Sequence, residues 1–273
     1  LKNKTILFTN ADASRKLPPK TAVLLVNGGI APHKNHPRYW NNLSLYYSTF
    51  KRLGAEQIRV LNSDGLSSAP DGNRRAFLGM FSFSDSNLKN SDIDLDGDGR
   101  PDVDGDSSKR SLLVALEELG SKLTPDAHVV IFITDHGQLR RRADGTRRAA
   151  LMLWGDEISG EELNAAVKKF IPPAVNLTLV ASQCYAGLFL EEFDRPNTTT
   201  IAASGHGPVW SNQEYNVFPY YFAQSLLGKD IATGVPIAAP AAKPAPASNP
   251  TLDELFAIAF HYAVKNDHLP EWP

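Results

Sequence analysis

The chain has little cysteine, no long apolar run and little net charge, and each of these features excludes a class of protein. Cysteine occurs once among 273 residues, so no internal disulfide can form. No apolar run approaches the roughly 20 residues that a membrane-spanning helix needs. The formal net charge is only -2, which provides no overall attraction to nucleic acid or to an acidic membrane. The sequence therefore predicts no disulfide scaffold, no membrane span and no nucleic-acid partner.

What is present is ordinary for a globular protein, with 42% hydrophobic and 21% charged residues, enough for a substantial core. The sequence opens on Leu1 without a visible signal peptide, and we interpret it as a trimmed fragment. Residues 1–20 are predicted to be a lead-in segment, and residues 21–273 a single domain. That domain contains an inserted loop at 85–106 and a Pro/Ala-rich linker at 234–250. The sequence leaves the oligomeric state open.

Apolar runs and helical spacing alternate along the chain. Strands are predicted at 21–27, 57–61, 127–134, 150–154, 176–181 and 198–203. Helices are predicted at 38–53, 107–119, 161–170, around 220–226 and after Thr251. This alternation predicts an α/β fold, with a mainly parallel sheet and helices on both faces. Asp144-Gly145 predicts a hairpin turn within an arginine-rich stretch at 140–148.

Two of the buried strands end in residues with reactive side chains. The run 127–134 leads into His136 and Gly137, and the run 176–181 leads into Cys184. Ligands of parallel sheets bind beyond the carboxyl ends of the strands, where both side chains are expected. An imidazole can take the proton of a thiol, and the N–H groups of Gly137 and Cys184 could stabilise an oxyanion. The pattern therefore predicts a cysteine peptidase.

The segment Phe132-Ile-Thr-Asp-His136-Gly137, followed by a helix and a strand ending in Cys184, resembles the legumain (asparaginyl endopeptidase) family. The resemblance covers roughly residues 21–228. It implies a caspase-like α/β/α sandwich with a six-stranded sheet that cleaves peptide bonds through an acyl-enzyme. Cys184 would attack, His136 would act as acid and base, and the amides of Gly137 and Cys184 would hold the oxyanion.

The resemblance also implies a substrate pocket, which departs from the family pattern. Arg38 matches the basic pocket residue, while Ser182 and Asn216 stand where the family has carboxylates. An Arg38 without carboxylate partners favours an acidic or carboxamide side chain before the scissile bond. Legumains orient the histidine with an Asn just before this Arg, and the candidates here are Asn35 and His36.

Seven aspartates occur within the fifteen residues 92–106. Their carboxylates would repel one another unless a hard divalent cation collects the oxygens. The register predicts a Ca²⁺ site whose ligands are Asp94, Asp96, Asp98 and Asp102. The twelfth position is Gly105 and not the Glu of an EF-hand, and the run is more similar to the calcium loops of thrombospondin type 3 repeats. We expect Ca²⁺ to be structural or activating, and calcium availability favours a secreted or extracytoplasmic location.

Two alternative functions stay open at this point. The same dyad could serve a transpeptidase or ligase, because an amine can intercept an acyl-enzyme in place of water. A caspase-fold module could also bind calcium without catalysis, as a scaffold. Covalent labelling of Cys184 by a peptidyl electrophile discriminates the enzyme from the scaffold. In both enzymatic readings the partner is a peptide or protein substrate.

Overall fold

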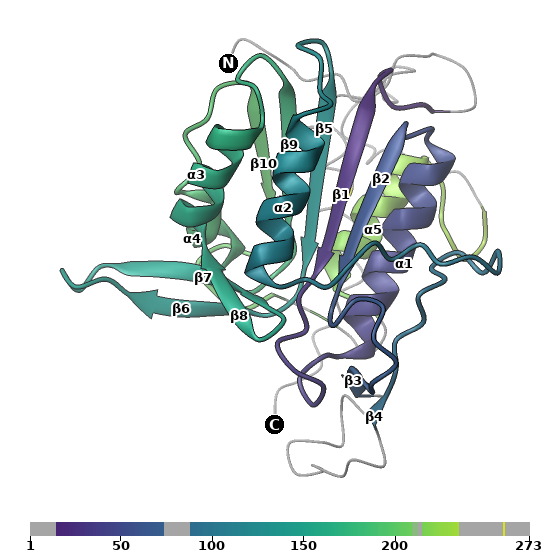
Figure 1. Ribbon diagram of the computed structural model, residues 1–273, viewed down its shortest axis with the longest axis horizontal. Helices are drawn as coiled ribbons and strands as arrows, with labels where there is room; N and C mark the ends of the chain where they lie inside the picture. The colour runs from purple at the N-terminus through teal and green to yellow at the C-terminus, as the bar shows by residue number, and fades with distance from the viewer. Residues whose placement is uncertain (1–14, 74–87, 210, 212–214, 235–258, 260–273) are drawn as a thin grey trace, which may run out of the picture.

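The computed structural model of the chain describes residues 15–73, 88–209, 211, 215–234 and 259. Its central feature is a parallel sheet with the strand order β10-β9-β5-β1-β2 (Figure 1). The five strands are β1 (Thr21–Asn27), β2 (Gln57–Asn62), β5 (His128–Thr134), β9 (Asn176–Ala181) and β10 (Thr198–Ala202). Near-continuous apolar runs form the central strands β1, β5 and β9, because both faces of the sheet are covered there, whereas the edge strands β2 and β10 contain polar residues and are partly exposed.

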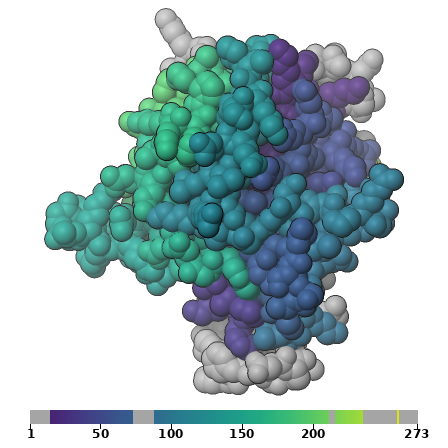
Figure 2. Space-filling model, viewed as in Figure 1, coloured from purple at the N-terminus to yellow at the C-terminus, as the bar shows by residue number. Residues whose placement is uncertain are grey.

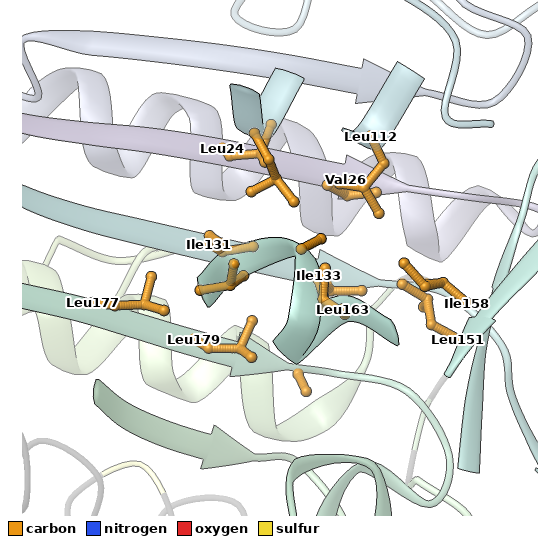
Figure 3. Packing of buried hydrophobic residues seen from close by; sticks show 14 of the residues in the cluster. Leu24, Val26, Leu112, Ile131, Ile133, Leu151, Ile158, Leu163, Leu177 and Leu179 are labelled. Atoms are coloured by element: carbon orange, nitrogen blue, oxygen red, sulfur yellow. The ribbon is translucent and has the colours of Figure 1, made fainter. Parts of the chain in front are cut away.

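Helices lie on both faces of the sheet, and alternate residues of each strand pack against different helices. On one face Leu24 and Val26 pack with α2 (Lys109–Gly120) and α3 (Gly160–Phe170), as the cluster in Figure 3 shows. On the other face Val23 and Leu25 pack with α1 (Pro37–Arg52) and α5 (Val217–Leu227). The predicted α/β/α sandwich is confirmed.

The predicted number of sheet strands is not reproduced in the described residues. The stretch predicted as a strand at 150–154 belongs to β7 (Arg147–Leu153), which pairs with β6 (Gly137–Arg141) and β8 (Asp156–Ser159) in a separate antiparallel sheet. The parallel sheet therefore has five strands in the described part of the chain, where six were predicted. Periodicity alone does not tell which sheet a short apolar strand joins.

The β6–β7 hairpin projects from the body of the molecule (Figures 1 and 2). Its turn is closed by a hydrogen bond from Arg142 N to Thr146 O, and Gly145 has a φ of +84°, as the predicted turn requires. Arg140 in β6 pairs with Glu157 of β8, and Arg142 at the turn pairs with Glu192. Part of the positive charge of this stretch is therefore neutralised within the chain.

Three short elements lie where a loop was predicted or nothing was assigned: β3 (Gly72–Asn73), β4 (Leu88–Lys89) and α4 (Ala186–Leu190). The end of the predicted lead-in packs on the domain, because Leu17 is buried and its N–H bonds to Leu53 O. The linker at 234–250 and the helix after Thr251 lie outside the described residues, except for Gly234 and Ala259. Within the described residues no helix combines the length and the apolar character of a membrane span.

Candidate active site

The two reactive residues lie side by side at the carboxyl edge of the sheet. Strands β5 and β9 are neighbours in register, with Ile133 opposite Ala181, and His136 and Cys184 each follow three residues later. The main chains beyond the strands touch, since a Cβ added to Gly137 would lie 1.8 Å from the carbonyl oxygen of Cys184. Only glycine permits this approach. The structure therefore brings the predicted His136-Gly137 pair against Cys184.

Cys184 occupies the turn between β9 and α4. The residue after it, Tyr185, has a φ of +60°, a left-handed conformation that is uncommon for a non-glycine residue. The thiol is half-buried, and its sulfur accepts a hydrogen bond from Val209 N at 3.3 Å. A strained turn of this kind is a feature of sites where a side chain must be held in one position.

The main chain at Lys34 orients the imidazole of His136. Its Nε2 atom lies 2.9 Å from Lys34 O, and because a carbonyl oxygen only accepts, Nε2 must carry the hydrogen. The neutral ring then has Nδ1 free to accept a proton. Burial lowers the pKa of His136 to about 4, with a smaller contribution from the charge of Arg38, so the ring is neutral at neutral pH.

The predicted orienting residues do not bond to His136. The Asn35 side chain is buried, and it donates to Ser63 Oγ at 2.7 Å and to Asp71 O at 2.9 Å. His36 packs its ring edge-on against His136 with 5.2 Å between the centroids. Asn35 thus fixes the loop after β1, and this loop presents the Lys34 carbonyl.

Aromatic rings hold the imidazole of His136 from two directions. Tyr39 is 2% exposed and lies 5.1 Å from the His136 ring, and His36 lies on another side. Burial raises the pKa of Tyr39. Burial also lowers the pKa of His36 to about 3, with Arg38 contributing, so both rings are uncharged at neutral pH. The imidazole therefore sits in an apolar surround with little freedom to rotate.

Asp135, the residue before His136, joins the loop after β1 to the loop after β5 through hydrogen bonds. Its buried carboxylate accepts hydrogen bonds from Gly29 N at 2.6 Å and from His136 N. A Cβ at Gly28 would lie 2.0 Å from Asp135 Oδ2, so that position must be glycine. Burial raises the pKa of Asp135 well above its usual value, against the effect of its N–H donors.

The N–H of Gly137 is directed away from its sheet. In the β6–β7 ladder, Met152 N bonds to His136 O and Arg142 N bonds to Thr146 O, so bonded positions alternate along β6. Gly137 falls between bonded positions, and its N–H therefore points to the open edge of β6. Among the described residues nothing accepts from Cys184 N either. Both donors predicted for an oxyanion are uncommitted.

Of the predicted pocket residues, the structure joins Ser182 to Asn216. Asn216 Nδ2 lies 3.0 Å from both the carbonyl oxygen and Oγ of Ser182, and both residues are fully buried. The N–H of Asn216 donates to Asn42 Oδ1, one helical turn beyond Arg38 in α1. Arg38 stacks on Tyr39, and no carboxylate of the described residues lies within ion-pair distance of its guanidinium.

Three of the four predicted calcium ligands come together. One carboxylate oxygen each of Asp94, Asp96 and Asp102 lies within 4.8 Å of the others. The fourth, Asp98, is outside this group. The ammonium of Lys51 lies 2.5 Å from Asp96 Oδ2 and 3.4 Å from Asp98 Oδ2. Asp96 Oδ1 is buried without a hydrogen-bond partner. A buried, unpaired carboxylate oxygen fits a cation ligand, since burial without a partner is costly.

The acidic loop is packed onto α1. Leu95 and Val103 are buried in the core beside that helix. Ser44 Oγ donates to Leu95 O at 2.6 Å, and the hydroxyl of Tyr47 donates to Asp102. A cation held by this loop would therefore stiffen the helix that carries Arg38 and Tyr39 at its start.

Several residues of the site were not assigned from the sequence. Lys34 contributes a carbonyl and Val209 an N–H. Tyr39 contributes an aromatic ring, and Asp135 contributes a buried carboxylate. Only Asp135 carried a signal, since it stands beside the histidine. His206, in the loop after β10, pairs with Glu191 at 2.5 Å, and its side chain is 48% exposed.

The chain was compared with known proteins. No family model matches it, and neither does any curated protein. Among solved structures, the protein GSU0716 of Geobacter sulfurreducens is similar to 61% of this chain at 12% identity, with a TM-score of 0.40. The matched part spans 51% of that chain, about half its length. A likeness at this level carries no argument about activity, so the function must be argued from the site.

Proposed function

We propose that the chain is a cysteine endopeptidase whose dyad is Cys184 and His136. The observation that carries this proposal is the contact between Gly137 and Cys184 at the ends of two neighbouring parallel strands. The Nε2–Lys34 contact supports it, because Nδ1 of a neutral imidazole is then available to a thiol.

In the proposed reaction the Sγ–H proton passes to His136 Nδ1 as sulfur attacks the scissile carbonyl carbon. The N–H groups of Gly137 and Cys184 stabilise the negative oxygen. The carbon–nitrogen bond then breaks, and Nδ1 returns the proton to the leaving amine, which leaves a thioester. Water attacks the thioester with the same imidazole as base, and the acid and the free thiol are released.

Arg38 is proposed to recognise the side chain before the scissile bond. Its guanidinium lies 5.0 Å from the centroid of the Tyr39 ring, which packs against His136, and no described carboxylate lies within ion-pair distance of it. An acidic or carboxamide side chain would complement it. Because Ser182 and Asn216 are buried and bond to each other, we assign them to the support of the pocket wall.

Ca²⁺ is proposed to bind Asp94, Asp96 and Asp102, and to stabilise the protein. Carboxylate oxygens are the ligands that Ca²⁺ prefers, and three of them already converge. When bound, the ion would neutralise these carboxylates and hold the loop in place. Asp98 is not assigned to the ion, because its carboxylate lies outside the group in which the other three converge.

A peptide-library digestion tests the activity. The digestion is run with and without added Ca²⁺, and the new amino termini are mapped by mass spectrometry. The protein should cleave peptides, and acidic or carboxamide residues should precede the cuts. The variant Cys184→Ala should cleave nothing. Cleavage that persists in this variant would contradict the proposal, and a preference for basic residues before the cut would contradict the role of Arg38.

A further inference from the structure

A cavity of about 340 Å³ lies beside the dyad and has no part in the chemistry described above. One wall is the beginning of α1, with His36, Pro37 and Trp40. The opposite wall is the segment from Lys89 to Asp92, which follows β4. Figure 1 shows the start of α1 and the β3–β4 pair close together below the sheet.

The position of the cavity relative to the dyad follows from the order of the strands. Cys184 follows β9, His136 follows β5, and the cavity is formed by segments that follow β1 and β2. The ring of His36 belongs to both places, since it lines the cavity and packs against His136. Along the sheet edge the cavity is therefore on the far side of His136 from the thiol.

This side is where the leaving group of the substrate must lie. His136 has to give a proton to the departing amine, so the residues after the scissile bond pass the imidazole on the side away from the sulfur. The acyl part of the substrate remains with Cys184. The cavity does not include Arg38, the residue proposed to contact the acyl side, and it is placed to contact the leaving peptide.

The walls of the cavity indicate which side chain it accepts. Trp40 Nε1 donates to Asp92 O at 2.8 Å, so the polar atom of the indole is already satisfied. His36 is uncharged at neutral pH because burial lowers its pKa to about 3. With Pro37 these rings make one aromatic and apolar wall, while the facing wall is polar and consists of Lys89, Asn90, Ser91 and Asp92. The volume is at the small end of ligand pockets, which run from roughly 300 to 1,000 Å³, and suits one large side chain.

We propose that this cavity binds a large aromatic or apolar side chain from one of the first two residues after the scissile bond. This inference rests on the proposed peptidase function and adds to it the selection of the leaving peptide. It also bears on ligation, because an incoming amine that intercepts the thioester would occupy the same pocket.

The test uses peptides that share one acyl side and differ only at the two positions after the cut. Peptides with Phe or Trp there should be cleaved with a kcat/KM about tenfold higher than peptides with Gly, in the range that one apolar contact provides. Trp40→Ala should remove this preference, so that Phe and Gly peptides are cleaved with equal kcat/KM. Trp40→Phe, which retains a ring, should keep most of it. Phe170→Ala is the matched control, a half-buried aromatic at the end of α3.

The outcomes separate the inference from the function on which it rests. Equal cleavage of Phe and Gly peptides, or a preference that survives in Trp40→Ala, overturns the inference and leaves the peptidase proposal standing. Failure to cleave any peptide overturns both. A thioester preformed from an activated ester gives a second readout. Its capture by Phe-amide should exceed its capture by Gly-amide in the native protein, and the two should be equal in Trp40→Ala.

Discussion

Helix α1 meets two candidate sites, and it does so by different means at its two ends. Near its start, Arg38 and Tyr39 surround an imidazole that is held by a carbonyl oxygen and by glycine-enabled contacts between loops. Near its end, Tyr47 and Lys51 meet the acidic loop through side-chain hydrogen bonds and an ion pair. The first site depends on the order of strands in the sheet, whereas the second is built from one continuous segment.

This difference decides how each site should respond to damage. Substitutions at the sheet edge should abolish activity and have small effects on the structure of distant parts of the chain, because the reacting groups come from separate loops. Changes in the acidic loop should lower stability more than activity, because its proposed Ca²⁺ ligands meet α1 at the end away from His136. The predictions below use this contrast, beginning with the largest expected effect.

Gly137→Ala should be the most damaging single substitution after loss of the dyad itself. The added Cβ would lie 1.8 Å from Cys184 O, so the two loops must separate and the N–H of Gly137 leaves its position. Loss of one oxyanion donor costs about 10²–10³ in kcat, which steady-state peptide hydrolysis would measure. At Gly207 nothing lies within 4 Å of an added Cβ. Gly207→Ala should therefore keep its activity, and equal losses in both variants would contradict this role of Gly137.

Arg38→Gln should discriminate between substrates. Peptides with Asp or Glu before the cut should lose roughly 10- to 100-fold in kcat/KM, the range expected for a lost charge-assisted contact. Peptides with a neutral residue there should change little. Arg38→Lys keeps the charge without the bidentate geometry, and should retain part of the preference. Loss of the same size for acidic and neutral peptides would indicate a general role in positioning His136.

Calcium should raise the melting temperature through the triad and not through Asp98. At a Ca²⁺ concentration of 100 Kd, binding adds about 2.7 kcal/mol, which corresponds to a rise of roughly 5–10 °C in a chain of this size. Asp96→Asn should lose the rise, and Asp98→Asn should keep it, because the Asp98 carboxylate lies outside the converging group of Asp94, Asp96 and Asp102. Scanning calorimetry with and without chelator measures both. A rise that depends on Asp98 alone would contradict the assigned ligands.

The pH dependence of stability should carry a small contribution from His36. Its folded-state pKa is lowered to about 3, so the unfolded state binds the proton first. The contribution is complete above the unfolded pKa of about 6.5 and is lost as the pH falls toward 3. The unfolding free energy of the native chain falls between pH 7 and pH 4. In His36→Gln this fall should be smaller by about 1–2 kcal/mol, a range that allows for the partial exposure of His36. Urea unfolding at both pH values measures this, and parallel losses would show that His36 does not titrate in this way.

The contrast between the two ends of α1 also explains what the sequence could predict. Asp94, Asp96 and Asp102 were predicted from spacing alone, since the ligands of a continuous loop lie close in the sequence. The meeting of His136 and Cys184 followed from apolar runs that mark buried parallel strands, and the β5–β9 register agrees with it. The sandwich with its helices on both faces followed from the same alternation.

The remaining features depend on atoms or contacts that carry no local signature. Every residue has a main-chain carbonyl, so nothing in the sequence identifies that of Lys34 as the partner of an imidazole. Asp98 has the spacing of a ligand, but in the folded loop its carboxylate lies outside the group formed by Asp94, Asp96 and Asp102. The cavity at Trp40 joins segments on either side of β2, a juxtaposition that only the fold creates.

The rate at which a peptidyl electrophile modifies Cys184 measures the central pairing most directly. A general base contributes about 10²–10⁴ to such a step. Modification at pH 6, followed by intact-mass spectrometry, should therefore be at least about 100-fold slower in His136→Ala than in the native chain. Equal rates in the two proteins would mean that the imidazole does not act on the thiol, and the proposed dyad would be contradicted.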